Sequence, residues 1–172
     1  GATGFIGQYC LHNLVNEGFE VHATSRLRHE TESSLDSVHW HMVDLFETGS
    51  EEAIVNKIRP THLLHFAWYA EPSHYWTATE NFQCVRSSLA LLQAFSEQGG
   101  ERVVMAGTCA EYDWSHGWCS ENVTPRAPNT VYGTCKNALQ DMLSIYSKQF
   151  GLSSAWGRIF FLYGPREHPS RL

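Results

Sequence analysis

The chain has 172 residues, five of them cysteine, and a formal net charge of -6 at pH 7. This length allows one domain with a substantial core and is too short for two large domains. The acidic balance and the scattered Lys and Arg residues argue against a nucleic-acid-binding surface, which needs clustered basic side chains. No apolar run approaches the roughly 20 residues that span a bilayer, so no membrane association is expected.

The cysteines are widely spaced and form no C-x-x-C pair. This pattern favours reduced thiols in a cytoplasmic protein over a disulfide scaffold or a zinc site. Among the ten histidines, His39 and His41 could place two rings on one face of a strand. No Cys, Asp or Glu completes a recognisable ligand set with them, so we expect solvated or packed histidines and no metal site.

The stretch 1–7 (GATGFIG) carries three glycines spaced three residues apart, and an apolar helical pattern follows it up to residue 15. Glycine has no Cβ, so the chain can turn tightly and leave its amides open to an anion. The start of the next helix aims N–H groups and the positive end of its dipole at the same place. The stretch therefore predicts a dinucleotide diphosphate site, with an ordinary glycine-rich turn as the alternative. The candidate contacts are Gly1, Gly4, Phe5, Ile6 and Gly7.

A dinucleotide-binding fold has a hydrophobic strand immediately before its first glycine, and here that glycine is residue 1. We therefore expect the chain to be a fragment that lacks the first strand. The next strand, predicted over 20–25, ends at Thr24-Ser25-Arg26, and no carboxylate follows until Glu30. An arginine at this point suits the 2′-phosphate of NADP, so NADP is preferred over NAD, which stays possible. The alternative is that Arg26 and Arg28 are solvated loop charges.

Strands and helices alternate along the rest of the chain. Residues 29–37 are polar and are expected to form a loop or a short helix. Further strands are predicted over 38–43, 61–67, 102–106 and 153–162, and helices over 50–58, 79–98 and 130–150. This order predicts an α/β fold: a Rossmann-like, doubly wound parallel sheet with helices on both faces, in three α/β/α layers.

Two residues of the last helical pattern could do chemistry. Tyr132 and Lys136 are four residues apart and project from one helix face. A fixed cation nearby would lower the pKa of the tyrosine from about 10 towards neutrality. Thr108 follows a buried strand and could share a hydrogen bond with Tyr132, or could simply cap a turn. The aromatic residues of the segment 68–78 could wall a pocket or pack a loop.

Together these features resemble the NAD-dependent epimerase/dehydratase family, the extended short-chain dehydrogenases that act on nucleotide sugars. The resemblance covers nearly the whole chain, in order and at sensible spacing. The residues that carry it are Gly1-x-x-Gly4-x-x-Gly7, Asp44-Leu45, the strand end 65–67, Asn81, the segment 108–112, Tyr132-x-x-x-Lys136 and the segment from Arg158 through 163–165 (YGP).

The resemblance implies a role for each matching position. Tyr132 would be the acid/base of hydride transfer at a sugar hydroxyl or ketone, Lys136 would hold the nicotinamide ribose, and Thr108 would orient the sugar hydroxyl. The diphosphate would lie on the three glycines. The remaining implied contacts are Asp44 and Leu45 at the adenine, Ala67 against the cofactor, and Asn81 and Phe161 at the substrate.

The chain also departs from the family pattern. Cys109-Ala110 stand where 4,6-dehydratases carry an acid pair, which counts against dehydration, and Glu111 is interpreted as a local structural or pocket residue. Phe161 replaces an asparagine that often contacts the sugar nucleotide. The leading hypothesis is therefore a nucleotide-sugar epimerase or ketoreductase. The alternatives are a 4,6-dehydratase and a non-catalytic NAD(P)-binding sensor or scaffold module.

The resemblance also implies features of the whole protein. The residues 1–172 would be the dinucleotide-binding domain, and a smaller substrate-binding domain is expected beyond residue 172. The two long helices, predicted over 79–98 and 130–150, commonly pair across a homodimer in this family.

Overall fold

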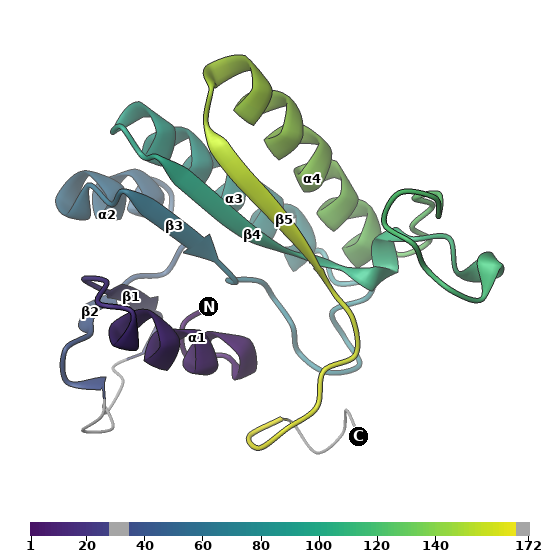
Figure 1. The fold of residues 1–172 in the computed structure, drawn as a ribbon, viewed down its shortest axis with the longest axis horizontal. Coiled ribbons are helices and arrows are strands. Elements are labelled where there is room, and N and C mark those ends of the chain that lie inside the picture. The colour runs from purple at the N-terminus through teal and green to yellow at the C-terminus, as the bar shows by residue number, and fades with distance from the viewer. Residues whose placement is uncertain (28–34, 168–172) are drawn as a thin grey trace.

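The computed structural model describes residues 1–27 and 35–167. In these ranges helices and strands alternate as the sequence predicts (Figure 1). The predicted loop or short helix at 29–37, with Arg28 and Glu30, falls mostly outside the described residues. The elements are α1 (Phe5–Asn16), β1 (His22–Ser25), β2 (His39–Met42), α2 (Ser50–Ile58), β3 (His62–His65), α3 (Glu80–Glu97), β4 (Arg102–Thr108), α4 (Val131–Phe150) and β5 (Ser153–Ile159), with the short 3-10 helices η2 (Cys109–Glu111) and η3 (Trp114–His116) after β4.

All strand pairs are parallel, as expected, but they form two sheets in the described part of the chain. One sheet pairs β1 with β2, and the other has the order β3-β4-β5. Within the described ranges, β1 and β3 each hydrogen-bond to a strand on one side only, so no strand pair joins the two sheets. Gly1 packs against the backbone of Phe66 and Ala67 just after β3. The strand expected before Gly1 stays a prediction.

The main apolar core lies between the β3-β4-β5 sheet and helices α3 and α4. Phe95 of α3 and Val103 of β4 have no exposed surface, and Leu139 of α4 is 1% exposed. They belong to one cluster of buried side chains, whereas α1 packs on β1 and β2 through a separate cluster around Leu11 and Val21. Burial of apolar surface at about 25 cal/mol per Å² is the main force that fixes these helices on the sheets.

The boundaries of α4 follow from its sequence. Thr130 is the N-cap, and its Oγ1 accepts a hydrogen bond of 3.0 Å from the backbone N–H of Gly133. Gly151 ends the helix with a φ of 70°, a left-handed conformation that suits glycine. Tyr132 therefore lies in the first turn of a well-defined helix. None of the helices in residues 1–27 and 35–167 is both long and apolar enough to cross a membrane.

Candidate functional site

A cavity of about 750 Å³ lies where the chain leaves the carboxyl ends of the parallel strands. This is where ligands of open α/β sheets bind, and the volume is in the usual range for a small-molecule site. Most of the predicted site residues line this cavity. They are Gly1, Gly4, Phe5, Ile6, Gly7, Arg26, Asp44, Leu45, Ala67, Thr108, Tyr132, Lys136 and Phe161.

The glycine turn is built by close backbone contacts. A Cβ on Gly7 would lie 2.2 Å from the carbonyl oxygen of Gly1, and a Cβ on Gly1 would lie 2.4 Å from the carbonyl carbon of Phe66. Both positions therefore exclude any larger residue. Gly4 is different, because a Cβ added at this position would contact only the carbonyl oxygen of Gly1, at 3.4 Å. Gly4 lines the cavity directly before α1, so a small residue there leaves room for a ligand beside the helix start.

The start of α1 has the chemistry that a diphosphate needs. Gly4 is its N-cap, and no side chain in the described ranges caps the helix. The N–H groups of a first helical turn have no partner inside the helix, so they can bind an anion at this point. The residues present thus fit the diphosphate of a dinucleotide.

The ends of β1 and β2 border the same cavity. Thr24, Ser25 and Arg26 supply hydroxyl and guanidinium groups to it. Asp44, just after β2, accepts a hydrogen bond of 2.9 Å from the backbone N–H of Phe46 through Oδ1. Because a carboxylate has further lone pairs, Asp44 can still accept a hydrogen bond from a ligand.

Tyr132 is enclosed by aromatic rings. Its ring packs edge-on against Tyr75, Trp76 and Trp68, with centroid distances of 4.9, 5.7 and 6.3 Å. The backbone N–H of Tyr132 also donates to the carbonyl oxygen of Trp76 at 3.1 Å. The aromatic residues of the segment 68–78 thus line the cavity, the first of the two roles that the sequence left open. Three of them also pack around Tyr132, a contact that the sequence did not predict.

Burial raises the pKa of Tyr132 to about 12, although a hydrogen bond with Thr108 acts in the opposite direction. The expectation that the lysine moves the phenol towards neutral pH is therefore wrong for the ligand-free protein. The physical reason is that desolvation of a buried phenolate outweighs the stabilising contacts present.

Lys136 is 5% exposed and makes two contacts through its ammonium group. Nζ donates a hydrogen bond of 2.7 Å to the carbonyl oxygen of Ala106, and it lies 3.7 Å from the centroid of the Trp68 ring. Burial lowers the pKa of Lys136 to about 7, and Coulombic interactions with Cys84 and Glu111 oppose this effect. A cation held between a carbonyl and an indole face at the cavity wall suits the binding of ribose hydroxyls.

Thr108 ends β4 and caps the short helix η2. Its Oγ1 accepts from the N–H of Ala110 at 3.2 Å, and its own N–H donates to Glu111 Oε1 at 2.8 Å. The capping role that the sequence left open is therefore present, and Thr108 still lines the cavity. Glu111 has no exposed surface and also accepts from Arg158 Nε at 2.7 Å and Trp156 Nε1 at 3.0 Å. This carboxylate is structural, one of the two roles expected for it.

Asn81 is the predicted site residue that lies outside the cavity lining. It is completely buried, and its side-chain amide bonds only to protein groups. Oδ1 accepts from Trp68 Nε1 at 2.7 Å, and Nδ2 donates to the carbonyls of Tyr75 and Ala78 at 2.7 and 2.8 Å. Asn81 therefore holds the aromatic segment that encloses Tyr132, and direct contact with a substrate is not supported.

Two residues of the site make contacts that the sequence did not predict, although Trp68 belongs to the aromatic segment 68–78 and His65 to the strand end 65–67. Trp68 lies over Lys136, and no sequence spacing indicates a contact between a loop and a helix 68 residues later. His65 ends β3 and lines the cavity, where burial lowers its pKa to about 3, so its ring is neutral near pH 7. Its Nε2 lies 2.8 Å from Ser88 Oγ, which itself donates to the carbonyl oxygen of Cys84.

Comparison with known proteins gives a consistent result. A sequence model of the NAD dependent epimerase/dehydratase family matches residues 1–172. The chain is 29% identical over 170 residues to the dTDP-6-deoxy-L-talose 4-dehydrogenase (NAD(+)) of Aggregatibacter actinomycetemcomitans, covering 95% of this chain and 60% of that protein. It is 23% identical over 181 residues to UDP-glucuronic acid decarboxylase 1 of Xenopus tropicalis, covering 98% and 41%.

Solved structures share the fold. The UDP-glucose 4-epimerase of Thermus thermophilus, in complex with NAD, has a TM-score of 0.80 and 29% sequence identity, and the match covers 98% of this chain and 56% of that one. The chain thus spans between 41% and 60% of the length of these relatives.

Proposed function

Because the chain belongs to the NAD-dependent epimerase/dehydratase family, we propose that it carries the cofactor site and the acid/base residue of an enzyme that oxidises or reduces one carbon of a nucleotide sugar. The observation that carries this proposal is the meeting of Thr108, Tyr132 and Lys136 in the same cavity as the glycine turn. Relatives with this family's chemistry include a dTDP-sugar 4-dehydrogenase and a UDP-glucose 4-epimerase.

Tyr132 moves the proton in the proposed reaction. In oxidation its oxygen takes the proton of a sugar hydroxyl, and in reduction the phenol gives a proton to the ketone oxygen. A bound NAD(P) would accept or supply the hydride at the same carbon. Thr108 orients the sugar oxygen towards Tyr132, and Lys136 holds ribose hydroxyls. An epimerase and a ketoreductase share these steps, and a requirement for stoichiometric NADPH would distinguish the ketoreductase.

A 4,6-dehydratase is less well supported. Such an enzyme needs an acid beside Thr108 to expel water from the sugar. Among the described residues that line the cavity, the carboxylates are Asp44 and Glu167. Glu111 is buried against Arg158 instead, and Cys109 and Ala110 occupy the turn.

A non-catalytic sensor or scaffold would keep the glycine turn and need no acid/base residue. Thr108, Tyr132 and Lys136 are all present and all line the cavity, which favours the enzyme. The test is Tyr132→Phe in the full-length protein, with UDP-glucose and dTDP-6-deoxy-L-talose as probe substrates. We expect turnover to fall about 10²–10⁴-fold, because general acid-base catalysis contributes on this scale.

The affinity of Tyr132→Phe for NAD(P) should stay within about twofold of the parent's affinity, because the phenyl ring keeps the packing of the tyrosine ring. Tyr146→Phe is the matched control, since Tyr146 lies on the same helix but outside the cavity lining and should keep full turnover. Unchanged turnover in Tyr132→Phe would contradict the catalytic assignment. Normal NAD(P) binding by a parent that turns over no nucleotide sugar would instead favour the non-catalytic sensor hypothesis.

We also propose that NADP is preferred over NAD. Arg26 follows β1 directly and lines the cavity together with Thr24 and Ser25, which suits the 2′-phosphate of NADP. Arg26→Ala should lower the affinity for NADP+ about tenfold, or ~1.4 kcal/mol, and leave that for NAD+ unchanged in calorimetric titrations. Arg102→Ala, at the far end of β4, removes the same charge as a control. An equal loss of affinity for NADP+ and NAD+ in Arg26→Ala would contradict the proposed preference for NADP.

The substrate-binding part of the protein is a separate proposal. Phe161 and Tyr163 are 82% and 84% exposed, and Phe161 lies at the cavity. Aromatic rings exposed beside a cavity suit contact with a further domain or a substrate. We therefore also propose a smaller substrate-binding domain beyond residue 172.

A further inference from the structure

The strand pair β1 and β2 has two unlike faces. One face is apolar and packs towards α1 with Val21, Ala23, Val38 and Trp40. The other carries histidine rings that stack on one another: His22 lies on His39 with a centroid distance of 4.8 Å and on His41 with 5.3 Å. The sequence predicted His39 and His41 on one face, and the structure adds His22 from the neighbouring strand.

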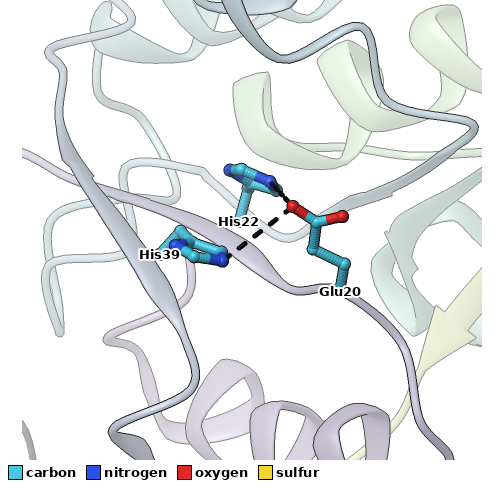
Figure 2. A group of neighbouring side chains, drawn as sticks. All are labelled: Glu20, His22 and His39. Carbon is cyan, nitrogen blue, oxygen red and sulfur yellow. Dashed lines mark hydrogen bonds and ion pairs between the residues drawn. The ribbon is translucent and has the colours of Figure 1, made fainter.

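Glu20 completes this cluster, contrary to the expectation that no carboxylate joins the histidines. Its Oε1 lies 3.2 Å from His22 Nε2 and 3.9 Å from His39 Nε2 (Figure 2). One ligand atom of each residue lies within 4.8 Å of the others. Ligand atoms bound tetrahedrally at 2.0–2.1 Å from a zinc ion lie about 3.3 Å apart, so the three atoms are close to a coordinating arrangement.

The backbone fixes two of the three ligands. His22 and His39 are directly paired in the parallel register, and the N–H of His39 donates to the carbonyl oxygen of Val21 at 2.8 Å. His22 has a further partner, because its Nδ1 lies 3.0 Å from His41 Nε2. A histidine that ligates a metal commonly bonds through its other ring nitrogen, which holds the ring in place and directs the free lone pair to the ion.

We propose that Glu20, His22 and His39 form a binding site for a divalent transition-metal ion such as Zn²⁺. Two imidazole nitrogens and one carboxylate are a ligand set that zinc accepts, with a water molecule at the fourth position. The three residues precede or begin β1 and β2, whereas the cavity lies at the carboxyl ends of the strands. The site is therefore separate from the proposed catalytic site, and a bound ion would clamp β1 to β2.

The cluster is better explained by an ion than by ion pairs alone. Glu20 is 76% exposed and His39 is 57% exposed, and ion pairs between such exposed groups contribute little to stability. One metal ion satisfies all three groups through their lone pairs.

The test is calorimetric titration of ZnCl₂ into the tag-free full chain near neutral pH, with MgCl₂ as the comparison ion. We expect one Zn²⁺ per chain and no comparable binding of Mg²⁺, which prefers oxygen ligands. Glu20→Gln and the double variant His22→Ala/His39→Ala should each weaken Zn²⁺ binding at least tenfold. Glu20 is so exposed that Glu20→Gln should keep the fold even if the double variant does not.

His116→Ala is the matched control, because His116 faces Asp113 at 3.8 Å as a single exposed histidine–carboxylate pair. It should bind Zn²⁺ like the parent. Zn²⁺ should also raise the melting temperature of the parent and of His116→Ala but not of Glu20→Gln, since only a bound ion stabilises the native state. Equal Zn²⁺ affinity in the parent and Glu20→Gln, or no Zn²⁺ binding by the parent, would overturn the proposal.

Discussion

Lys136 is a buried base whose charge depends on pH in the working range. Its pKa falls to about 7 in the native protein because burial removes the ammonium from water, whereas the ordinary value is 10.5. Between these two values the unfolded chain holds a proton that the native protein has lost. The free energy of unfolding therefore rises with pH through this window, since stability increases wherever the unfolded state binds more protons.

This dependence can be measured against Lys136→Met, which removes the titrating group and keeps the length of the side chain. The stability of the parent relative to Lys136→Met should increase from pH 7 to pH 10 by at most ~1.4 kcal/mol per pH unit, the value for one proton. Urea denaturation of the cofactor-free proteins at several pH values gives this difference. A difference that stays flat across the window would show that Lys136 is charged in the native state.

The same residues show what sequence patterns can predict about the site. The spacing of Tyr132 and Lys136 correctly placed both side chains at one cavity, because residues four apart share a helix face. The spacing did not predict the pKa values of these two side chains. The pKa of Tyr132 depends on rings from the segment 68–78, and that burial comes from tertiary packing, which spacing does not contain.

At the scale of elements, Glu111 joins three of them. It follows β4, belongs to η2 and accepts hydrogen bonds from Trp156 and Arg158 of β5. The backbone N–H of Thr108 is its third donor, at 2.8 Å. This single carboxylate therefore sets the turn that carries Thr108 at the cavity.

Glu111→Ala should destabilise the protein by about 3–5 kcal/mol, because it leaves the Arg158 guanidinium buried without its partner. Arg158 is only 14% exposed and Glu111 is fully buried. Asp141→Ala is the control, since the Arg126–Asp141 pair has the same 2.7 Å distance but is 37% and 51% exposed. It should change stability by less than about 1 kcal/mol. Similar losses in chemical denaturation of both variants would argue against a structural role of Glu111.

Element boundaries were predicted best where the chain carries its own signals. The predicted helix 50–58 is α2 as found; α3 is one residue shorter than predicted at each end, and α4 is one residue shorter at its start. The strands 61–67 and 153–162 are shorter than predicted, ending at His65 and Ile159. Apolar side chains continue past both ends because they line the cavity, so hydrophobicity alone could not show where strand pairing stops.

At the scale of the whole molecule, the fold gathers residues far apart in sequence at one edge. The five strands found in residues 1–27 and 35–167 are parallel to their neighbours, so their carboxyl ends deliver Arg26, Asp44, Ala67 and Thr108 to the same cavity. This is why the alternation of helix and strand was enough to predict the place of the site. The split into two sheets was not predictable from alternation, because it depends on which strand edges meet.

At the same scale, the outer surfaces of α3 and α4 expose apolar side chains. Phe82 on α3 is 61% exposed, and Met142, Ile145 and Phe150 on α4 are between 37% and 65% exposed. Exposed apolar side chains on two neighbouring helices suit contact with another protein surface. The predicted homodimer through these two helices would bury them, in a self-complementary interface around a two-fold axis.

Ile145→Asp tests this arrangement because it places a charge in the predicted interface without touching the core. The full-length parent should sediment as a dimer at micromolar concentration, and Ile145→Asp should shift it to the monomer. The dissociation constant should rise at least tenfold, since an unpaired charge buried in an interface costs several kcal/mol. Val123→Asp, at a 70% exposed position in the loop before α4, is the matched control and should stay dimeric. A parent that is monomeric at every concentration, or an Ile145→Asp variant that dimerises like Val123→Asp, would contradict the predicted dimer through α3 and α4.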